Sequence, residues 1–198
     1  LTPLREKGIR LVFYLDDIMI MANSREEAKR ATEALQKHLE RLGLTIKTKK
    51  SVREPSQKMT FLGFELDSGK MSVRIPQEKI KKVTQEVRKL CDTKRIKMRK
   101  LAALAGTLTS LAFGFKPNQI HQRYLQMSIA LFQNRGVPWD QRIPISWKTK
   151  ELRWWIRHLR RLNGWKIIEE GRIVHIFTDA AKSGWGSFSE ECGMPLSS

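Results

Sequence analysis

Cysteine is scarce in this chain of 198 residues, with only Cys91 and Cys192. Two distant cysteines without metal-ligand spacing argue against a disulfide framework and against a cysteine-based zinc site. No apolar run approaches the roughly 18 residues that a membrane-spanning helix needs, and no signal peptide opens the chain. These absences predict a soluble, intracellular protein, cytoplasmic or nuclear, with no membrane partner.

Acidic residues are also few, since 20 Asp and Glu stand against 38 Lys and Arg, for a formal net charge of +18. An excess of this size predicts a polyanionic partner, with nucleic acid first and a negatively charged membrane surface as the competitor. The basic residues occur along nearly the whole length, which favours a broad groove over a disordered basic arm.

Two adjacent carboxylates, Asp16 and Asp17, lie between the apolar segments Arg10–Leu15 and Ile18–Ala22. The length and composition of these segments predict two strands with the acids at the tip of their hairpin. Adjacent carboxylates repel each other, and a divalent cation bound through oxygen, Mg²⁺ above all, is the usual compensation. A polar turn without chemistry is the alternative, because Asp also favours turns.

The segments after this hairpin alternate between helical and strand patterns. Ser24 and Glu27 form a capping box for a helix that ends near Gly43. The further predictions are a strand at 44–46, a basic loop at 47–51, a second hairpin made of 59–66 and 71–75 around a turn at 67–70, helices from 76, from 97 and over 119–133, a helix capped by Ser146, and a strand over 172–178 that ends at Asp179.

Two features of these segments leave alternatives open. Gly63, between large apolar residues, predicts either a close backbone approach or a bulge. Trp154, Trp155 and Trp165 lie among arginines and could stack nucleic-acid bases, although a core position is the more frequent role of tryptophan in an amphipathic helix.

Three motifs resemble those of reverse transcriptases. Tyr14-Leu15-Asp16-Asp17 resembles their Tyr-x-Asp-Asp box, and Phe61-Leu62-Gly63-Phe64 resembles their primer grip. The segment from Phe177 to Gly186 resembles the opening hairpin of a ribonuclease H domain. Among relatives, the motifs look most like tyrosine-recombinase retrotransposons, with long-terminal-repeat elements next.

The resemblance implies a set of roles. Asp16 and Asp17 would be catalytic and would bind two Mg²⁺ ions, with Mn²⁺ as a substitute, and Asp179 would be the first metal ligand of the ribonuclease H site. A lysine near the triphosphate matches Lys49 or Lys50, with Lys50 assigned to catalysis and Lys49 to primer and template binding. Primer and template contacts are assigned to Tyr14, Leu62, Gly63 and Phe64.

The implied fold class is α+β, in four parts. They are a palm portion (1–75), a helical thumb (76–137), a helical connection (138–170) and the start of a ribonuclease H-like domain (171–198). The implied partners are an RNA or DNA template with a DNA primer, deoxynucleoside triphosphates, and the remaining polyprotein segments. The implied reaction is attack of the primer 3′-hydroxyl on the α-phosphate of the triphosphate.

The chain also departs from the family pattern. In the family, the third metal-binding carboxylate and the fingers precede the point where this sequence starts, and ribonuclease H needs acids beyond Asp179 that Glu190 and Glu191 do not supply. We therefore expect the isolated chain to be inactive in both reactions. A non-catalytic nucleic-acid-binding protein derived from a retroelement is the rival hypothesis, and a telomerase-like or intron-encoded polymerase is a third, against which the ribonuclease H-like segment argues.

Overall fold

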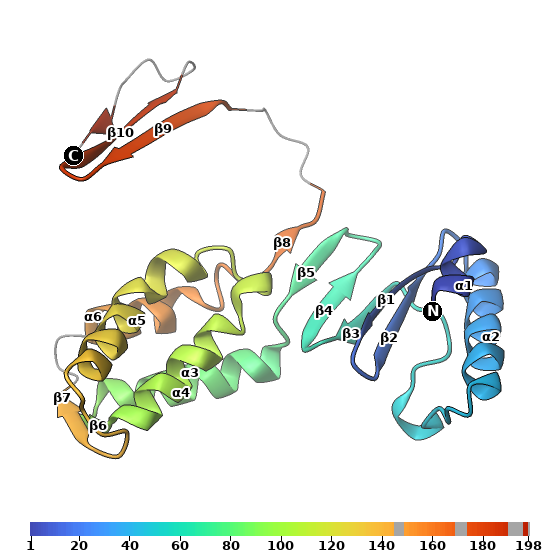
Figure 1. The fold of residues 1–198 in the computed structure, drawn as a ribbon, viewed down its shortest axis with the longest axis horizontal. Coiled ribbons are helices and arrows are strands. Elements are labelled where there is room, and N and C mark those ends of the chain that lie inside the picture. The colour runs from blue at the N-terminus through green and yellow to red at the C-terminus, as the bar shows by residue number, and fades with distance from the viewer. Residues whose placement is uncertain (145–148, 169–173, 190–195, 198) are drawn as a thin grey trace. The chain divides into compact units, whose positions relative to one another are not determined.

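The computed structural model describes residues 1–144, 149–168, 174–189 and 196–197. The chain divides into two compact units, Leu1–Ile167 and Ile168–Ser198. Helices and antiparallel strands occur together in the first unit, and strands make up the described part of the second (Figure 1). Within the described ranges, no helix is both long and apolar enough to cross a membrane.

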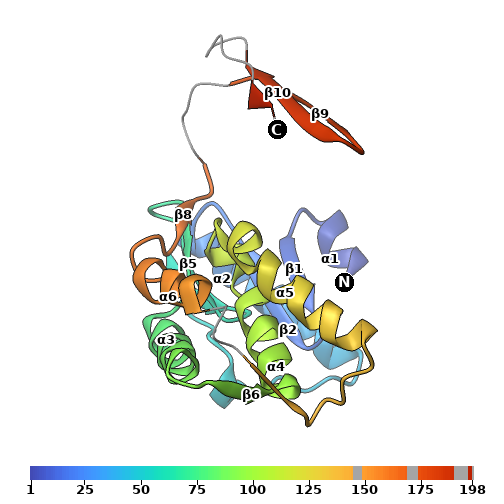
Figure 2. The ribbon, with the colours of Figure 1, turned by 90° about the vertical axis from the view of Figure 1, so that its left-hand side faces the viewer.

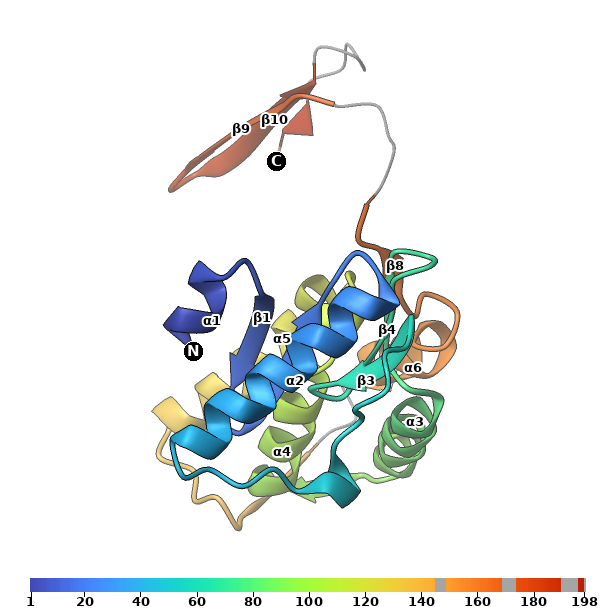
Figure 3. The same ribbon diagram turned by 90° about the vertical axis from the view of Figure 1, so that its right-hand side faces the viewer.

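The N-terminal elements form a small layer of two strands and two helices. They are α1 (Thr2–Glu6), β1 (Arg10–Tyr14), β2 (Asp17–Met21) and α2 (Arg25–Arg41). The hydroxyl of Ser24 accepts a hydrogen bond from the Glu27 amide at 3.1 Å, which confirms the predicted cap of α2. Leu4, Leu11 and Leu35 form a buried cluster where α1, β1 and α2 meet, and α2 runs along the hairpin (Figure 3).

The predicted strand at 44–46 is wrong. These residues follow α2 without pairing to any strand in the described part of the chain, and a short 3₁₀ turn, η1 (Thr48–Lys50), comes next. The apolar pattern of Leu44-Thr45-Ile46 suits a strand, but a strand needs a neighbour to accept and donate its backbone hydrogen bonds.

The second sheet contains one more hairpin than the sequence predicts. Its strands are β3 (Lys58–Phe61), β4 (Phe64–Asp67), β5 (Ser72–Arg74) and β8 (Trp165–Lys166), in the antiparallel order β3-β4-β5-β8. The segment 59–66 is thus two strands and not one. Leu62 (φ 48°) and Gly63 (φ 77°) form the two-residue turn between them, so Gly63 serves the turn and not a bulge.

Four helices and a short ribbon form the largest body of the first unit (Figure 2). Its elements are α3 (Gln77–Cys91), β6 (Arg95–Lys97), α4 (Met98–Thr109), the 3₁₀ turn η2 (Ala112–Gly114), α5 (Asn118–Asn134), β7 (Arg142–Pro144) and α6 (Thr149–His158). Helix α4 packs on α5, α3 packs on α6, and β6 pairs with β7. The predicted helices from 76, from 97 and over 119–133 are confirmed within a few residues.

Helix α6 belongs to the same core as α3, α4 and α5. Its residues Leu152, Trp155 and Leu159 are buried among Val87, Leu104 and the other members of one continuous cluster. Of the two roles that the sequence left open, base stacking and a core position, Trp155 therefore has the core position. The Ser146 cap predicted for this helix lies outside the described residues.

Two glycines join the helical body to the second sheet. The Gly164 amide donates a hydrogen bond to the Gly114 carbonyl at 2.9 Å, and the Asn163 side chain both accepts from the Ile75 amide and donates to its carbonyl, each at 2.9 Å. A Cβ on Gly164, whose φ is +88°, would lie 2.8 Å from the Val73 carbonyl oxygen. The backbones at this junction approach too closely for any side chain.

Gly164→Ala is expected to lower the free energy of unfolding by about 2–4 kcal/mol, because left-handed strain adds to a clash with backbone. Gly136→Ala is the matched control: Gly136 also has a positive φ (+68°), but nothing lies within 4 Å of its Cβ position. Urea denaturation followed by circular dichroism measures both. Equal losses in the two variants would contradict the clash.

Three stacked rings connect α5 with α6. The Trp154 indole stacks with the His121 imidazole at 3.3 Å between centroids and with His158 at 4.6 Å. Burial, followed by the nearby His158, lowers the pKa of His121 below its ordinary value of 6.5. The folded protein therefore holds the His121 proton less tightly than the unfolded chain does.

The stability contributed by neutral His121 should be present above about pH 6.5 and lost as the pH falls toward the lower, folded pKa, because the unfolded state then binds more protons. The urea midpoint is expected to fall between about pH 7.5 and about pH 5.5. His121→Phe keeps an aromatic ring on Trp154 and removes the titration, so its midpoint should fall less. An equal fall in both proteins would assign the effect to other groups.

The described part of the second unit is a small antiparallel sheet of β9 (Ile176–Ala181), β10 (Gly184–Ser189) and β11 (Leu196–Ser197), in the order β11-β10-β9. The predicted strand end at Asp179 is wrong, because β9 continues to Ala181 and the turn falls at Lys182 and Ser183. Asp179 pairs with Gly186 in the middle of the ladder. The predicted strand residues 172 and 173 lie outside the described part.

Candidate functional site

The hairpin of β1 and β2 carries both adjacent carboxylates at one end. Tyr14 pairs with Asp17, so the two-residue turn consists of Leu15 and Asp16, and Asp17 begins β2. The sequence placed both acids in the turn; the structure places only Asp16 there. Leu15 has a φ of 53°, a left-handed conformation that is uncommon for leucine and that sets the tight turn.

The two faces of the hairpin differ. Leu11 pairs with Ile20, and these side chains face the buried cluster beneath α2. Because neighbours along a strand alternate between faces, Tyr14 and Asp17 share the opposite face, and both are exposed. The apolar face fixes the hairpin on the helix, and the carboxylate of Asp17 remains open to a ligand.

The chemistry of Asp16 and Asp17 fits part of a magnesium site. Carboxylate oxygens are the ligands that Mg²⁺ takes, commonly one or two carboxylates together with substrate phosphates and water. Among the described residues, no group of three or more His, Cys, Asp or Glu gathers to hold a metal ion. The hairpin therefore contributes two carboxylates, and the described chain adds no third ligand to them.

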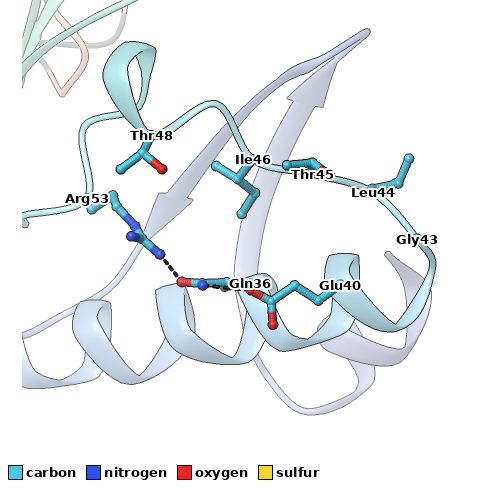
Figure 4. A pocket seen from close by; sticks show the side chains of 8 residues that line it. All are labelled: Gln36, Glu40, Gly43, Leu44, Thr45, Ile46, Thr48 and Arg53. Atoms are coloured by element: carbon cyan, nitrogen blue, oxygen red, sulfur yellow. Dashed lines mark hydrogen bonds between the residues drawn. The ribbon is translucent and has the colours of Figure 1, made fainter.

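The assigned lysines lie on a different segment. Lys49 and Lys50 are exposed in η1, and no described hydrogen bond or ion pair connects them with Asp16 or Asp17. The loop that precedes them covers a hollow of 340 Å³ against α2, lined by polar and apolar side chains (Figure 4). There Arg53, which follows η1, donates to Gln36 of α2 and so links this segment to the helix, while Gln36 donates to Glu40 within α2 at 2.7 Å.

The Phe61–Phe64 segment separates into a buried part and an exposed part. Leu62 and Gly63 form the exposed tip, whereas Phe64 is 8% exposed and belongs to the helical core. The Phe64 ring meets Phe113 edge to face at 5.2 Å between centroids. Phe64 therefore anchors this hairpin to the helices, and its side chain is not open to a primer.

Sequence reasoning missed Lys79 at this hairpin. Its ammonium lies 5.2 Å from the centre of the Phe64 ring and 3.6 Å from the position that a Cβ on Gly63 would take. In the sequence, Lys79 is one of several lysines on an amphipathic helix, and nothing in that pattern points to Gly63. The proximity arises because the first turn of α3 brings Lys79 to the Phe64 ring and the Gly63 turn, and it has no local signal.

Asp179 lies in the second unit, on exposed strand β9. Its carboxylate accepts a hydrogen bond from the adjacent Ala180 amide at 2.9 Å. The structure places it in a regular hairpin, and among the described residues no group of three or more His, Cys, Asp or Glu that could hold a metal ion forms around it.

Residues 1–66 match the family model described as "Reverse transcriptase (RNA-dependent DNA polymerase)". The carboxylate hairpin lies within that match. Over 70 residues, the chain is 39% identical to the Gag-Pol polyproteins of Rous sarcoma virus subgroup B (strain Schmidt-Ruppin) and of Avian leukosis virus subgroup A (isolate RSA). This stretch is 34% of the present chain and 4% of each polyprotein.

The fold is similar to that of the foamy viral protease-reverse transcriptase, whose structure was solved in complex with double-stranded DNA. The likeness covers 99% of this chain and 33% of that one, with a TM-score of 0.63 and 17% sequence identity. It confirms the predicted α+β class. The resemblance to reverse transcriptases is thus confirmed for residues 1–66, and the rest of the chain shares a likeness of fold, while the retrotransposon subtype stays a prediction.

Proposed function

We propose that this chain is part of a retroelement reverse transcriptase that performs template-directed DNA synthesis by two-metal nucleotidyl transfer. The observation that carries the proposal is the pair Asp16 and Asp17 at the exposed end of a hairpin, inside the segment that matches the reverse transcriptase family. Such a pair, fixed by a buried strand face, is suited to hold cations where phosphate charge develops.

In this proposal Asp16 and Asp17 would hold the two Mg²⁺ ions, which when bound would activate the primer hydroxyl and neutralise the leaving oxygen. The third ligand would come from outside the described residues. Tyr14, on the same face as Asp17, would contact the primer end. Lys49 or Lys50 would approach the triphosphate.

The second hairpin would position the primer. The exposed backbone of Leu62 and Gly63 would lie close to a strand of nucleic acid. The Lys79 ammonium beside Gly63 would contact the phosphates of that strand. Phe64 would act indirectly, by holding the hairpin on the helical body. The net charge of +18 fits a template and primer bound mainly through phosphate.

The second unit would begin a ribonuclease H domain, with Asp179 as its first metal ligand. Further acids from the rest of the polyprotein would be needed to complete that site. The Gag-Pol similarity supports a polyprotein as the source of the missing segments.

A non-catalytic nucleic-acid-binding protein derived from a retroelement is the second candidate. It is favoured by the finding that no third metal ligand joins Asp16 and Asp17 within the described residues. In such a protein the basic surface would act and the two acids would be inert.

Primer extension on an RNA template separates the two candidates. The chain is tested by itself and within the full polypeptide that includes these residues, each beside its Asp→Asn variants at 16 and 17. If the full polypeptide extends the primer and its Asp→Asn variants do not, the result supports the polymerase. A full polypeptide that folds and binds duplex but does not extend the primer, or that extends it equally without the acids, contradicts the polymerase, whereas the isolated chain is expected to be inactive.

A further inference from the structure

Helix α5 exposes a continuous stripe of large apolar side chains. This apolar stripe consists of Ile120, Tyr124, Met127 and Leu131, which are 74%, 66%, 55% and 48% exposed. Their spacing of four, three and four residues places them on one face of the helix. Single exposed apolar residues are ordinary on a protein surface, but a contiguous patch of this kind marks a contact with another molecule.

The other side of α5 packs on α4 (Figure 2), and three of the four residues that α5 buries there are polar: Asn118, Gln122 and Ser128. The Asn118 amide group donates to the Leu108 carbonyl, and the Gln122 side-chain oxygen accepts a hydrogen bond from the Thr109 hydroxyl at 3.0 Å. These hydrogen bonds fix the rotation of α5 about its own axis. The apolar stripe cannot turn toward the core without leaving buried polar groups unpaired, which is costly.

Helix α5 is also nearly without charge. Arg123 is the one Lys, Arg, Asp or Glu among its 17 residues, whereas the whole chain carries a net charge of +18. A nucleic-acid backbone or an anionic membrane surface needs several cations beside the contact, and a charged protein partner needs complementary charges. A second copy of this chain needs neither, and the face of α5 is where two such basic chains repel each other least.

The spacing of the apolar stripe is self-complementary. In an antiparallel pair of helices related by a twofold axis, residue i contacts residue j and residue j contacts residue i. With the axis between residues 125 and 126, Ile120 lies opposite Leu131 of the second copy, and Tyr124 lies opposite Met127. Alternating steps of four and three residues are those of the a and d positions in a coiled-coil seam. A methionine against an aromatic ring is a favourable contact.

We propose that two copies of this chain form a twofold-symmetric dimer in which their apolar stripes pack against each other in antiparallel orientation. At about 100 Å² for each side chain, the stripe would remove roughly 400 Å² of apolar surface per copy from water. Since the centre of a homodimer interface is about 65% apolar, the total buried area would be roughly 1,200 Å². That area is at the lower limit of specific interfaces, so we expect a reversible dimer with a Kd on the order of 10 μM. The proposal does not depend on the function of the carboxylate hairpin.

Sedimentation velocity of the full chain tests the dimer, over about 1–200 μM protein and in about 0.3 M salt to screen the net charge. Tyr124→Lys and Met127→Glu are measured separately and as an equimolar mixture, and circular dichroism verifies that each variant folds. Val52→Lys and Val52→Glu are the matched controls. Val52 is 76% exposed, belongs to no helix or strand and lies outside the apolar stripe.

The two controls are expected to dimerise with the Kd of the unmodified chain, within about twofold. Each stripe variant alone should raise the Kd at least about tenfold, because it buries a charge against an apolar side chain. The equimolar mixture should associate at least about fivefold more tightly than either variant alone. In the mixed dimer the introduced ammonium lies opposite the introduced carboxylate, and the second contact between Tyr124 and Met127 is unchanged.

An unmodified chain that stays monomeric at about 200 μM would overturn the proposal. A dimer that persists in both stripe variants would overturn it as well, because the contact would then use another face. A mixture no tighter than its components would exclude the antiparallel register. Self-association that requires an added DNA duplex would make nucleic acid, and not a second copy, the occupant of the stripe. If either stripe variant fails to fold, Ile120→Glu and Leu131→Lys repeat the mixture with the outer pair.

Discussion

Asp17→Asn is expected to reduce template-directed DNA synthesis by the full polypeptide at least about a thousandfold, because a metal ligand in phosphoryl transfer supplies several kcal/mol of transition-state stabilisation. The carboxamide has nearly the shape of the carboxylate but no charge. The Asp17 side chain is exposed and forms no described hydrogen bond or ion pair, so the fold should be unaffected. Incorporation of labelled nucleotide on an RNA template in Mg²⁺, under single-turnover conditions, measures the loss.

Asp92→Asn provides the control for this experiment. Asp92 is also an exposed acid, at the end of α3 and away from the hairpin, and its replacement should leave synthesis within about twofold. Duplex binding by both variants should stay near that of the unmodified protein. If Asp17→Asn retained more than about a tenth of the synthesis, the carboxylate would not be a metal ligand.

Local signals were enough to place most of the helices. The Ser24 cap depends on two residues three positions apart, and the stripes of α3, α4 and α5 depend on spacing within one helix. These features can be predicted from a short stretch of sequence, because the buried face of a helix is set by residues of the same segment. The carboxylate hairpin was predictable for the same reason: both strands and the turn lie within a dozen residues.

The wrong predictions concern features that depend on residues elsewhere in the chain. The segment 44–46 has the composition of a strand, but whether it pairs depends on a neighbour that its own residues do not encode. Phe64 resembles a primer-contacting residue, yet the helices around Phe113 bury it. Lys79 lies beside Gly63 only because tertiary packing brings the first turn of α3 to that hairpin. Site assignments that rest on a motif identify the segment but not the bounds of its turn, and they leave the direction of each side chain to tertiary packing.

The core position of Trp155 leads to the largest expected effect on stability. Its side chain is 1% exposed and packs on Phe115 at 5.1 Å between ring centroids. Its indole N–H donates to the His121 carbonyl at 3.0 Å, which connects α6 to α5. Trp155→Ala should lower the free energy of unfolding by about 3–5 kcal/mol, since the buried area is lost and a cavity remains.

Two further variants divide this loss into its causes. Trp155→Phe keeps a ring against Phe115 but removes the donor to His121, and should cost about 1–3 kcal/mol. Trp139→Ala removes an indole that is 43% exposed and should cost less than about 1 kcal/mol. Urea denaturation is followed by far-ultraviolet circular dichroism, which reports on the helices and not on the second unit. A loss below about 1 kcal/mol for Trp155→Ala would mean that α6 does not share the core of α3–α5. A helix that leaves the core exposes its tryptophan to water in the folded and in the unfolded state, so truncation of that side chain costs little.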